Sequence, residues 1–274
     1  MIVFDEVERV QDGAHSFTIY DCRAEDGENM VAVLADFVRG LYVDPEKLRD
    51  VLIAAMTDAT GVADPDAINE AVQRTLTAGV PQPGTHPKPH LDTARNELGE
   101  ALTHLAFVHA HGTVVPASRI RNKEIGGQPS RGRDLLGLDE EPLTAVIGEV
   151  KSSSHEASPP GVVETGNDCL KAQFLAFLGA PDAVLTELNW AMKHAEEKDK
   201  ALIGRAMLAH IANELPLCAA PVLVRPMERR GANDFGTFKD NPAQFAPAAV
   251  RFSILTIEGS LEELADAVYT AARA

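Results

Sequence analysis

The sequence predicts an α/β (α+β) protein in which a mixed sheet is flanked by helices and preceded by a smaller N-terminal α+β region. Three observations predict it. Two segments of alternating apolar and polar residues open the chain, a proline-rich stretch follows two short helical segments, and the remainder mixes helices with short apolar strands. With 274 residues, 45% of them hydrophobic, the chain is long enough to bury a full core.

The N-terminal region begins with two expected strands, residues 1–10 and 15–23, which a short turn joins. Residues 28–43 have the apolar spacing of a helix. Two further short helices are expected because two segments begin with Asp-Pro followed by an acidic residue. Asp44 and Asp64 are their expected N-caps, with proline in the first turn.

A proline-rich stretch, residues 81–91, carries four prolines between Pro81 and Pro89, and no helix can cross it. We therefore expect a boundary there, with an acidic N-terminal α+β region at 1–80 and a second domain at 92–274. In the second domain the expected elements are a helix at 91–112, strands at 113–118, 133–138 and 143–154, a helix at 166–179, a long helix or helical pair at 182–215, strands at 217–226 and 249–258, and a helix at 260–274.

Composition narrows the class of protein. No apolar run reaches the length of a membrane span, and the N-terminus turns acidic early, unlike a signal peptide. The three cysteines are far apart and predict neither a disulfide framework nor a Cys-x-x-Cys metal pair, so we expect the reducing cytoplasm. No glycine-rich phosphate motif appears, so no nucleotide cofactor is expected on this chain.

The segment 143–154 combines a buried apolar strand with charges. Glu149 and Lys151 are two residues apart and therefore share one face of the strand. Asp134 lies on the neighbouring strand if the intervening residues form a hairpin, as the turn chemistry of residues 137–142 favours. Two carboxyl groups and one ammonium group then converge, although unpaired buried charges are costly.

A divalent cation resolves this repulsion. Mg²⁺ or Mn²⁺ takes oxygen ligands such as Asp134 and Glu149, and Lys151 can hold an attacking water or balance charge on a phosphate. The alternative interpretation is a structural salt bridge between Glu149 and Lys151. A second Glu-x-Lys sequence, at residues 196–198, lies in a polar helical run and is interpreted as a solvated helix face.

Asp134, fourteen residues, and then Glu149-Val150-Lys151 resemble the signature of the PD-(D/E)XK nuclease superfamily. The resemblance implies a restriction-endonuclease-like fold and metal-dependent hydrolysis of DNA phosphodiester bonds. It also implies that the Val150 carbonyl faces the ion. Arg133, where the signature often has proline, is a departure.

The same resemblance implies an acidic ligand on the helix before the hairpin and a polar residue on the helix after it. Glu100 is preferred for the first role because its neighbours form the apolar stripe, and Glu97 is the alternative. Lys171 or Gln173 are the candidates for the second role.

The combination of these motifs with an acidic N-terminal region is similar to the HamA family, the nuclease subunits of Hachiman anti-phage systems. This similarity implies a helicase partner of the HamB type. A catalytically silent, nuclease-like DNA-binding or scaffolding subunit is the alternative.

Charge is distributed unevenly along the acidic chain, whose formal net charge is −16. Residues 1–80 hold 16 acids and 6 bases, a net of −10, and are expected to face a protein partner or shield the site. Residues 119–133 hold five bases and one acid, a net of +4, and either bind DNA or form a solvated loop. The five expected DNA-binding residues are Arg119, Arg121, Lys123, Arg131 and Arg133.

Overall fold

A computed structural model describes residues 1–60, 62–84, 93–120, 132–180 and 182–274. The strands are β1 (Ile2–Asp12), β2 (His15–Ala24), β3 (Leu135–Glu140), β4 (Leu143–Ser152), β5 (Leu217–Pro226) and β6 (Ala249–Ile257). The helices are α1 (Met30–Tyr42), α2 (Pro45–Thr60), α3 (Pro65–Gly79), α4 (Thr93–His109), α5 (Gly161–Glu164), α6 (Leu170–Leu178), α7 (Ala183–His194), α8 (Glu197–Ile211), α9 (Thr237–Asp240) and α10 (Leu261–Arg273).

The strands of the described residues form one six-stranded sheet in the order β1-β2-β6-β5-β4-β3. Its central pairs, β2 with β6, β6 with β5 and β5 with β4, are parallel. The two outer pairs, β1 with β2 and β3 with β4, are antiparallel hairpins. The predicted mixed sheet flanked by helices is confirmed.

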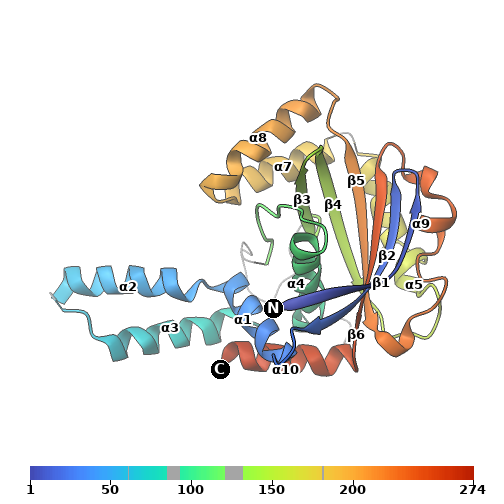
Figure 1. The fold of residues 1–274 in the computed structure, drawn as a ribbon. Coiled ribbons are helices and arrows are strands. Elements are labelled where there is room, and N and C mark those ends of the chain that lie inside the picture. The colour runs from blue at the N-terminus through green and yellow to red at the C-terminus, as the bar shows by residue number, and fades with distance from the viewer. Residues whose placement is uncertain (61, 85–92, 121–131, 181) are drawn as a thin grey trace.

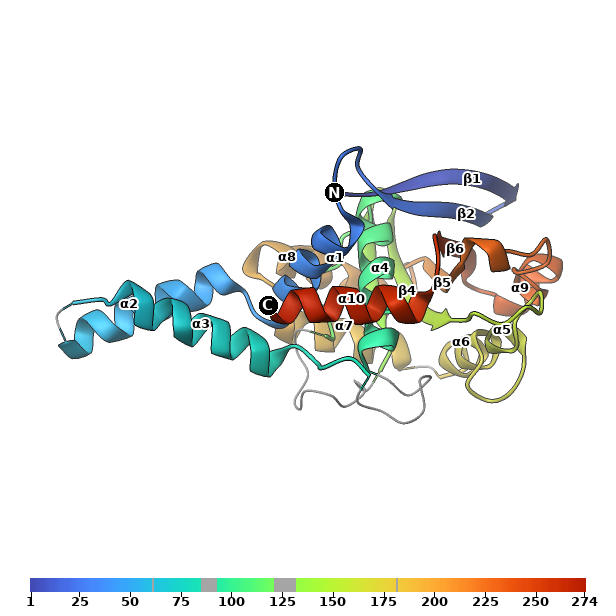
Figure 2. The same ribbon diagram turned by 90° about the horizontal axis from the view of Figure 1, so that it is seen from below.

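Two hydrophobic cores lie on opposite faces of the sheet, as the helices do in Figure 1 and Figure 2. Residues of α1, α4 and α10 cover the face that contains Val146 and Val150. Residues of α6, α7 and α8 cover the face that contains Ile147 and Leu223. Consecutive residues of a strand point to opposite faces, so Glu149 and Lys151 share the second face with Ile147.

Helices α2 and α3 project from the rest of the molecule as a hairpin (Figure 1 and Figure 2). A small core of their own, which includes Ile68, Val72 and Leu76, holds them together. The expected caps are present: the Asp64 side chain accepts a hydrogen bond from the Asp66 N–H at 3.0 Å, and that of Asp44 accepts from the Lys47 N–H at 3.0 Å.

The sheet passes through both regions that the sequence divides at residues 81–91. Strands β1 and β2 belong to the same sheet as β3–β6, and α1 and α10 share one core. Most of the proline-rich stretch lies outside the described residues, so the division stays a prediction. The partner-docking role of residues 1–80 also stays a prediction.

Two element predictions need comment. The strand predicted at residues 113–118 is wrong, because only Val114 pairs, in a single bridge to Leu138. Pro116 has no N–H to extend that pairing. The segment 182–215 forms the helical pair α7 and α8 rather than one helix. The helix predicted at residues 91–112 is α4, and residues 91 and 92 of that prediction lie outside the described residues.

Candidate active site

Asp134 lies directly before β3 at the edge of the sheet. Strand β3 pairs with β4 only as far as Leu135, opposite Gly148, so the Val150 N–H lies beyond the last backbone pair on that edge. The Asp134 side chain supplies the hydrogen-bond acceptor that a neighbouring strand would otherwise provide: its Oδ2 accepts from the Val150 N–H at 2.8 Å. Because β3 begins only at Leu135, the Asp134 side chain is fixed against Val150, the middle residue of the Glu-x-Lys sequence.

Glu149 and Lys151 face α6 from β4. The Lys151 Nζ lies 3.7 Å from Glu149 Oε1 and donates to both carboxylate oxygens of Asp168 at 3.2 Å. The side chain of Glu149 is 5% exposed and that of Lys151 is 19% exposed. A nearly buried carboxylate therefore lies beside an ammonium group that solvent, or a substrate, can still reach.

Asp134 and Glu149 influence each other's ionisation. Burial, and after it the charge of the adjacent Asp134 carboxyl, raise the pKa of Glu149 to about 8, against the opposing effect of Arg133. Burial also raises the pKa of Asp134, although the hydrogen bond from the Val150 N–H counteracts the shift. The Glu149 side chain also acts to lower the pKa of Asp134.

Helix α4 brings Glu97 and Glu100 to this site from the other face of the sheet. Gly99 allows the approach, because a Cβ at this position would lie 2.9 Å from Ser152 Oγ and 3.5 Å from a Val150 methyl group. Burial raises the pKa of Glu97 to about 8. It raises the pKa of Glu100 well above its usual range, and the charge of Asp134 adds to that effect.

One carboxyl oxygen of Glu100, Oε2, is buried without a hydrogen-bond partner among the described residues. A cavity of about 10 Å³, lined by Glu100, Asp134, His104 and Ser118, lies at this point. That volume is close to the smallest that holds one water-sized particle.

A ring of hydrogen bonds and ion pairs joins these charges to α6. Arg133 Nη1 donates to Glu149 Oε2 at 3.1 Å and to Gln173 Oε1 at 3.2 Å. The Gln173 Nε2 donates to Asp168 Oδ1 at 2.5 Å, and Asp168 accepts from Lys151. The ring therefore runs from Glu149 through Arg133, Gln173, Asp168 and Lys151 back to Glu149.

Sequence reasoning proposed Gln173 for this region and missed Asp168, whose only local signal is its position directly before the cap of α6. Lys171, the alternative to Gln173, is half-buried on the same helix. Its role in the site stays a prediction.

The family model named HamA matches residues 2–215, which is most of the chain and includes the whole ring. The chain belongs to the HamA family. No curated protein matches it. In the described ranges, no helix combines the length and the apolar character that crossing a bilayer requires.

The predicted DNA-binding residues of this HamA-family chain divide into two groups. Arg121, Lys123 and Arg131 lie outside the described residues. Arg119 is 8% exposed, and its guanidinium pairs with Glu187 and lies 4.0 Å from the centroid of the Trp190 ring. Its DNA contact stays a prediction, but the side chain also has a structural task.

That task is to fix the backbone that leads into the site. The Arg119 Nε donates to the Arg133 carbonyl at 2.7 Å, and Glu187 Oε1 accepts from the Arg133 N–H at 3.3 Å. Both backbone polar groups of Arg133 are thus held by the buried ion pair between Arg119 and Glu187 of α7. Asp134 follows directly, so its position depends on this pair.

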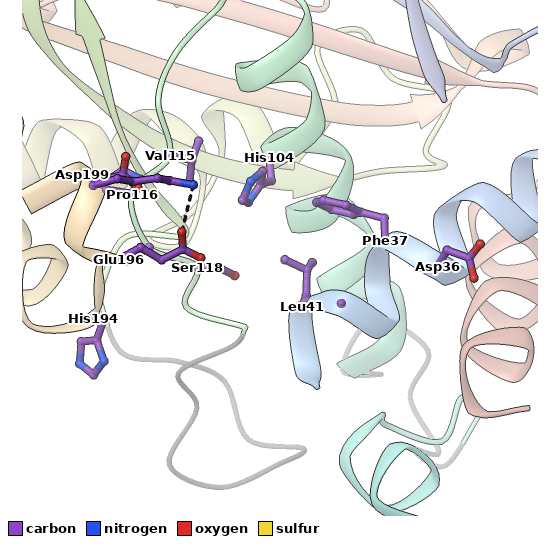
Figure 3. Close-up of a pocket in the computed structure, with 13 residues that line it drawn as sticks. Asp36, Phe37, Leu41, His104, Val115, Pro116, Ser118, His194, Glu196 and Asp199 are labelled. Carbon is purple, nitrogen blue, oxygen red and sulfur yellow. Dashed lines mark ion pairs between the residues drawn. The ribbon is translucent and has the colours of Figure 1, made fainter. Parts of the chain in front are cut away.

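A cleft of about 380 Å³ adjoins the small cavity, and the two share Leu41, His104 and Ser118. Figure 3 shows His104 and Phe37 on one side of the cleft and Glu196 and Asp199 on the other. Acidic groups in its lining disfavour phosphates. The partly exposed basic side chains beside Glu149 are those of Arg133 and Lys151.

The residues present fit a hard divalent cation by donor chemistry. Glu100 and Asp134 supply carboxyl oxygens, which Mg²⁺ and Mn²⁺ prefer, to a cavity of suitable size, and the Glu149 carboxyl lies near enough for its charge to act on Glu100. Within the described residues, however, no three His, Cys, Asp or Glu side chains already form a ligand set. Glu149 points its Oε2 at Arg133 instead. A cation would have to compete with that guanidinium.

Proposed function

We propose that this HamA-family chain is a metal-dependent endonuclease that hydrolyses DNA phosphodiester bonds in Hachiman anti-phage defence, together with a helicase partner. The observation that carries the proposal is the proximity of three buried carboxyls. Glu100 and Asp134 line one small cavity, the charges of Asp134 and Glu149 both act on Glu100, and Lys151 lies 3.7 Å from Glu149. Burying three carboxyls close together destabilises the fold, so stability does not explain their presence. Groups with such raised pKa values concentrate at functional sites.

The carboxyl groups would hold the cation, Mg²⁺ or Mn²⁺, with the Val150 carbonyl as a further ligand. When bound, the cation neutralises the carboxylates and supplies Lewis-acid chemistry at a phosphate oxygen. The chain's own residues do the rest. Asp134 is held by the Val150 N–H, and Glu149 is held on a strand inside the sheet, so both are fixed before substrate arrives.

Lys151 provides a positive charge that a phosphate can reach. Its ammonium group carries three donors and uses Glu149 and Asp168 as acceptors on one side. On the exposed side it would donate to a non-bridging phosphate oxygen or to the attacking water. It thereby stabilises the charge that builds up on the phosphate as the bond breaks.

The second candidate function is a silent nuclease-like subunit that binds DNA or organises a defence complex. The resting contact of Arg133 with Glu149 favours this candidate, because it occupies a carboxylate that catalysis would require. The two functions differ in one measurable property: the silent subunit would bind DNA without cutting it in any divalent cation.

The test is plasmid cleavage by the purified chain, with and without its helicase partner. Supercoiled DNA is incubated in Mg²⁺, in Mn²⁺ and in EDTA. We expect nicking that requires the cation and that falls roughly 10²–10⁴-fold in Lys151→Met and in Asp134→Asn. Lys200→Met, in an exposed ion pair with Glu197, is the matched control and should cleave as the wild type does.

Cleavage that persists in EDTA would contradict the metal-dependent mechanism. DNA binding without cleavage in both cations, with the partner present, would select the silent subunit instead.

A further inference from the structure

The side chain of Arg133 occupies the place where Glu149 would meet a cation. Its Nη1 bridges Glu149 Oε2 at 3.1 Å and Gln173 Oε1 at 3.2 Å, and its guanidinium lies 5.3 Å from the centroid of the Phe177 ring. The side chain remains 19% exposed. It is therefore held by defined contacts yet accessible from solvent.

Both oxygens of Glu149 face positive charges of the chain itself. Arg133 is 3.1 Å from Oε2, and Lys151 is 3.7 Å from Oε1. Through Gln173 and Asp168 the two cationic side chains are tied into one ring. A divalent cation that approaches Glu149 must displace one of them. Of the two, Lys151 pairs with two carboxylates, Glu149 and Asp168, whereas Arg133 pairs with the one carboxylate of Glu149 and otherwise contacts the neutral Gln173 and Phe177 side chains.

The side chain of Arg133 can change its rotamer, whereas its backbone cannot move. Its backbone is fixed at both polar groups, by Arg119 at the carbonyl and by Glu187 at the N–H. A rotation of the side chain therefore swings the guanidinium about a fixed point one residue from Asp134. The geometry confines Arg133 to the immediate surroundings of the carboxyls, whether it contacts Glu149 or something else.

We propose that Arg133 is a phosphate-binding positioning residue that rests on Glu149 in the free protein and leaves it when DNA arrives, so that DNA binding and cation binding favour each other. The inference rests on the proposed nuclease function. A guanidinium binds phosphate through two parallel hydrogen bonds, which the single nitrogen shared by Glu149 and Gln173 does not provide. A phosphate at the site draws Arg133 away and exposes Glu149 Oε2 to the cation.

The coupling is reciprocal by thermodynamic linkage. If DNA strengthens cation binding by a given factor, the cation strengthens DNA binding by the same factor. In the absence of DNA, Glu149 contacts the Arg133 guanidinium instead of a metal ion. The free protein is thereby kept in a weakly metal-binding form.

The test measures Ca²⁺ affinity by calorimetry, on the full chain, with and without a short DNA duplex. Ca²⁺ is the probe because it is a hard divalent cation with the same oxygen-ligand preference. We expect the duplex to raise the Ca²⁺ affinity of the wild type at least about fivefold. Arg133→Gln should bind Ca²⁺ without DNA about as tightly as the wild type does with DNA, and the duplex should then add little.

Three further variants make the result specific. Gln173→Leu removes one acceptor of the resting guanidinium and should give a smaller coupling than the wild type. Arg133→Lys keeps the charge but loses the planar fork, and its Ca²⁺ affinity without DNA should exceed that of the wild type. Arg205→Gln removes an exposed guanidinium that lies 3.9 Å from Glu140, and it should keep the wild-type coupling.

The outcomes separate this inference from the proposed function. Equal Ca²⁺ affinity and equal coupling in wild type, Arg133→Gln and Arg133→Lys would overturn the role of Arg133 while leaving the metal site in place. Ca²⁺ binding that Glu149→Gln does not weaken, or no Ca²⁺ binding by the wild type with duplex present, would instead overturn the metal site and the proposed function with it.

Discussion

The chain contains two Glu-x-Lys sequences, and their comparison shows what makes one of them a candidate site. In residues 196–198 the Lys198 Nζ lies 2.9 Å from Glu196, closer than the 3.7 Å between Lys151 and Glu149. The Glu196 and Lys198 side chains are 61% and 74% exposed, however, whereas that of Glu149 is 5% exposed. The shorter contact is the ordinary surface ion pair.

The difference between the two copies is one of surroundings. Water screens the exposed pair, so its contact contributes little to stability or chemistry. Around Glu149 the sheet and α6 exclude water, two further acids approach, and burial raises the pKa of the carboxyl to about 8. A motif of this kind is thus identified by burial and by neighbouring charge, and the distance within the motif is a poor guide.

The largest expected effect tests this comparison directly. Glu149→Gln should lower plasmid nicking by roughly 10³-fold, because it removes a charge from the proposed metal site. Glu196→Gln changes the same residue type in the exposed copy and should stay within about twofold. Circular-dichroism melts of both variants check the fold, and equal loss of nicking in both would end the distinction between the copies.

A second prediction concerns the stability of buried and exposed ion pairs. Arg119→Ala leaves Glu187 buried without its guanidinium partner and should lower the free energy of unfolding by about 3–5 kcal/mol. Lys198→Ala breaks the exposed pair and should lower it by about 1 kcal/mol or less. Urea unfolding measures both. Similar losses in the two variants would show that burial does not determine how much these ion pairs contribute to the free energy of unfolding.

A third prediction concerns how stability depends on pH. Burial raises the pKa of Glu97 from its ordinary value of 4.5 to about 8 in the folded chain. The unfolded chain therefore releases this proton first, and stability falls as pH rises between about 4.5 and 8, by at most about 1.4 kcal/mol per pH unit. Glu97→Gln removes this contribution.

The measurement is the melting temperature of wild type and Glu97→Gln across that pH range, without added cation. The two curves should converge at the acidic end and separate toward pH 8, where the variant should be the more stable. Parallel curves would show that Glu97 does not titrate in this range.

Local pattern predicted the strands that carry the site, because alternation and turn chemistry are encoded in neighbouring residues. It also predicted that Asp134 lies beside the Glu149–Lys151 segment, since a hairpin of known length fixes which residues lie side by side. The strand predicted at residues 113–118 was wrong because local pattern does not determine whether a segment finds a pairing partner. Its apolar residues fit a strand locally, but only Val114 finds a partner in the sheet.

The ring around Glu149 could not be predicted from local pattern. Arg133 appeared as a member of a basic segment and as a departure from the nuclease signature, and its contacts with Glu149 and Gln173 depend on how α6 packs against β4. Asp168 had no periodicity or motif to mark it. Arg119 seemed equivalent to the other bases of residues 119–133, and only the packing of α7 shows that it is buried against Glu187.

The strand order of the sheet also has a consequence for how the chain is made. Strand β4 is paired on its inner side by β5, which ends at Pro226, and β2 is paired by β6, which ends at Ile257. During synthesis from the N-terminus, the strand that carries Glu149 and Lys151 therefore lacks its inner neighbour until more than 70 further residues have been added. The surroundings of Glu149 and Lys151 therefore cannot be completed on the ribosome before β5 has been synthesised.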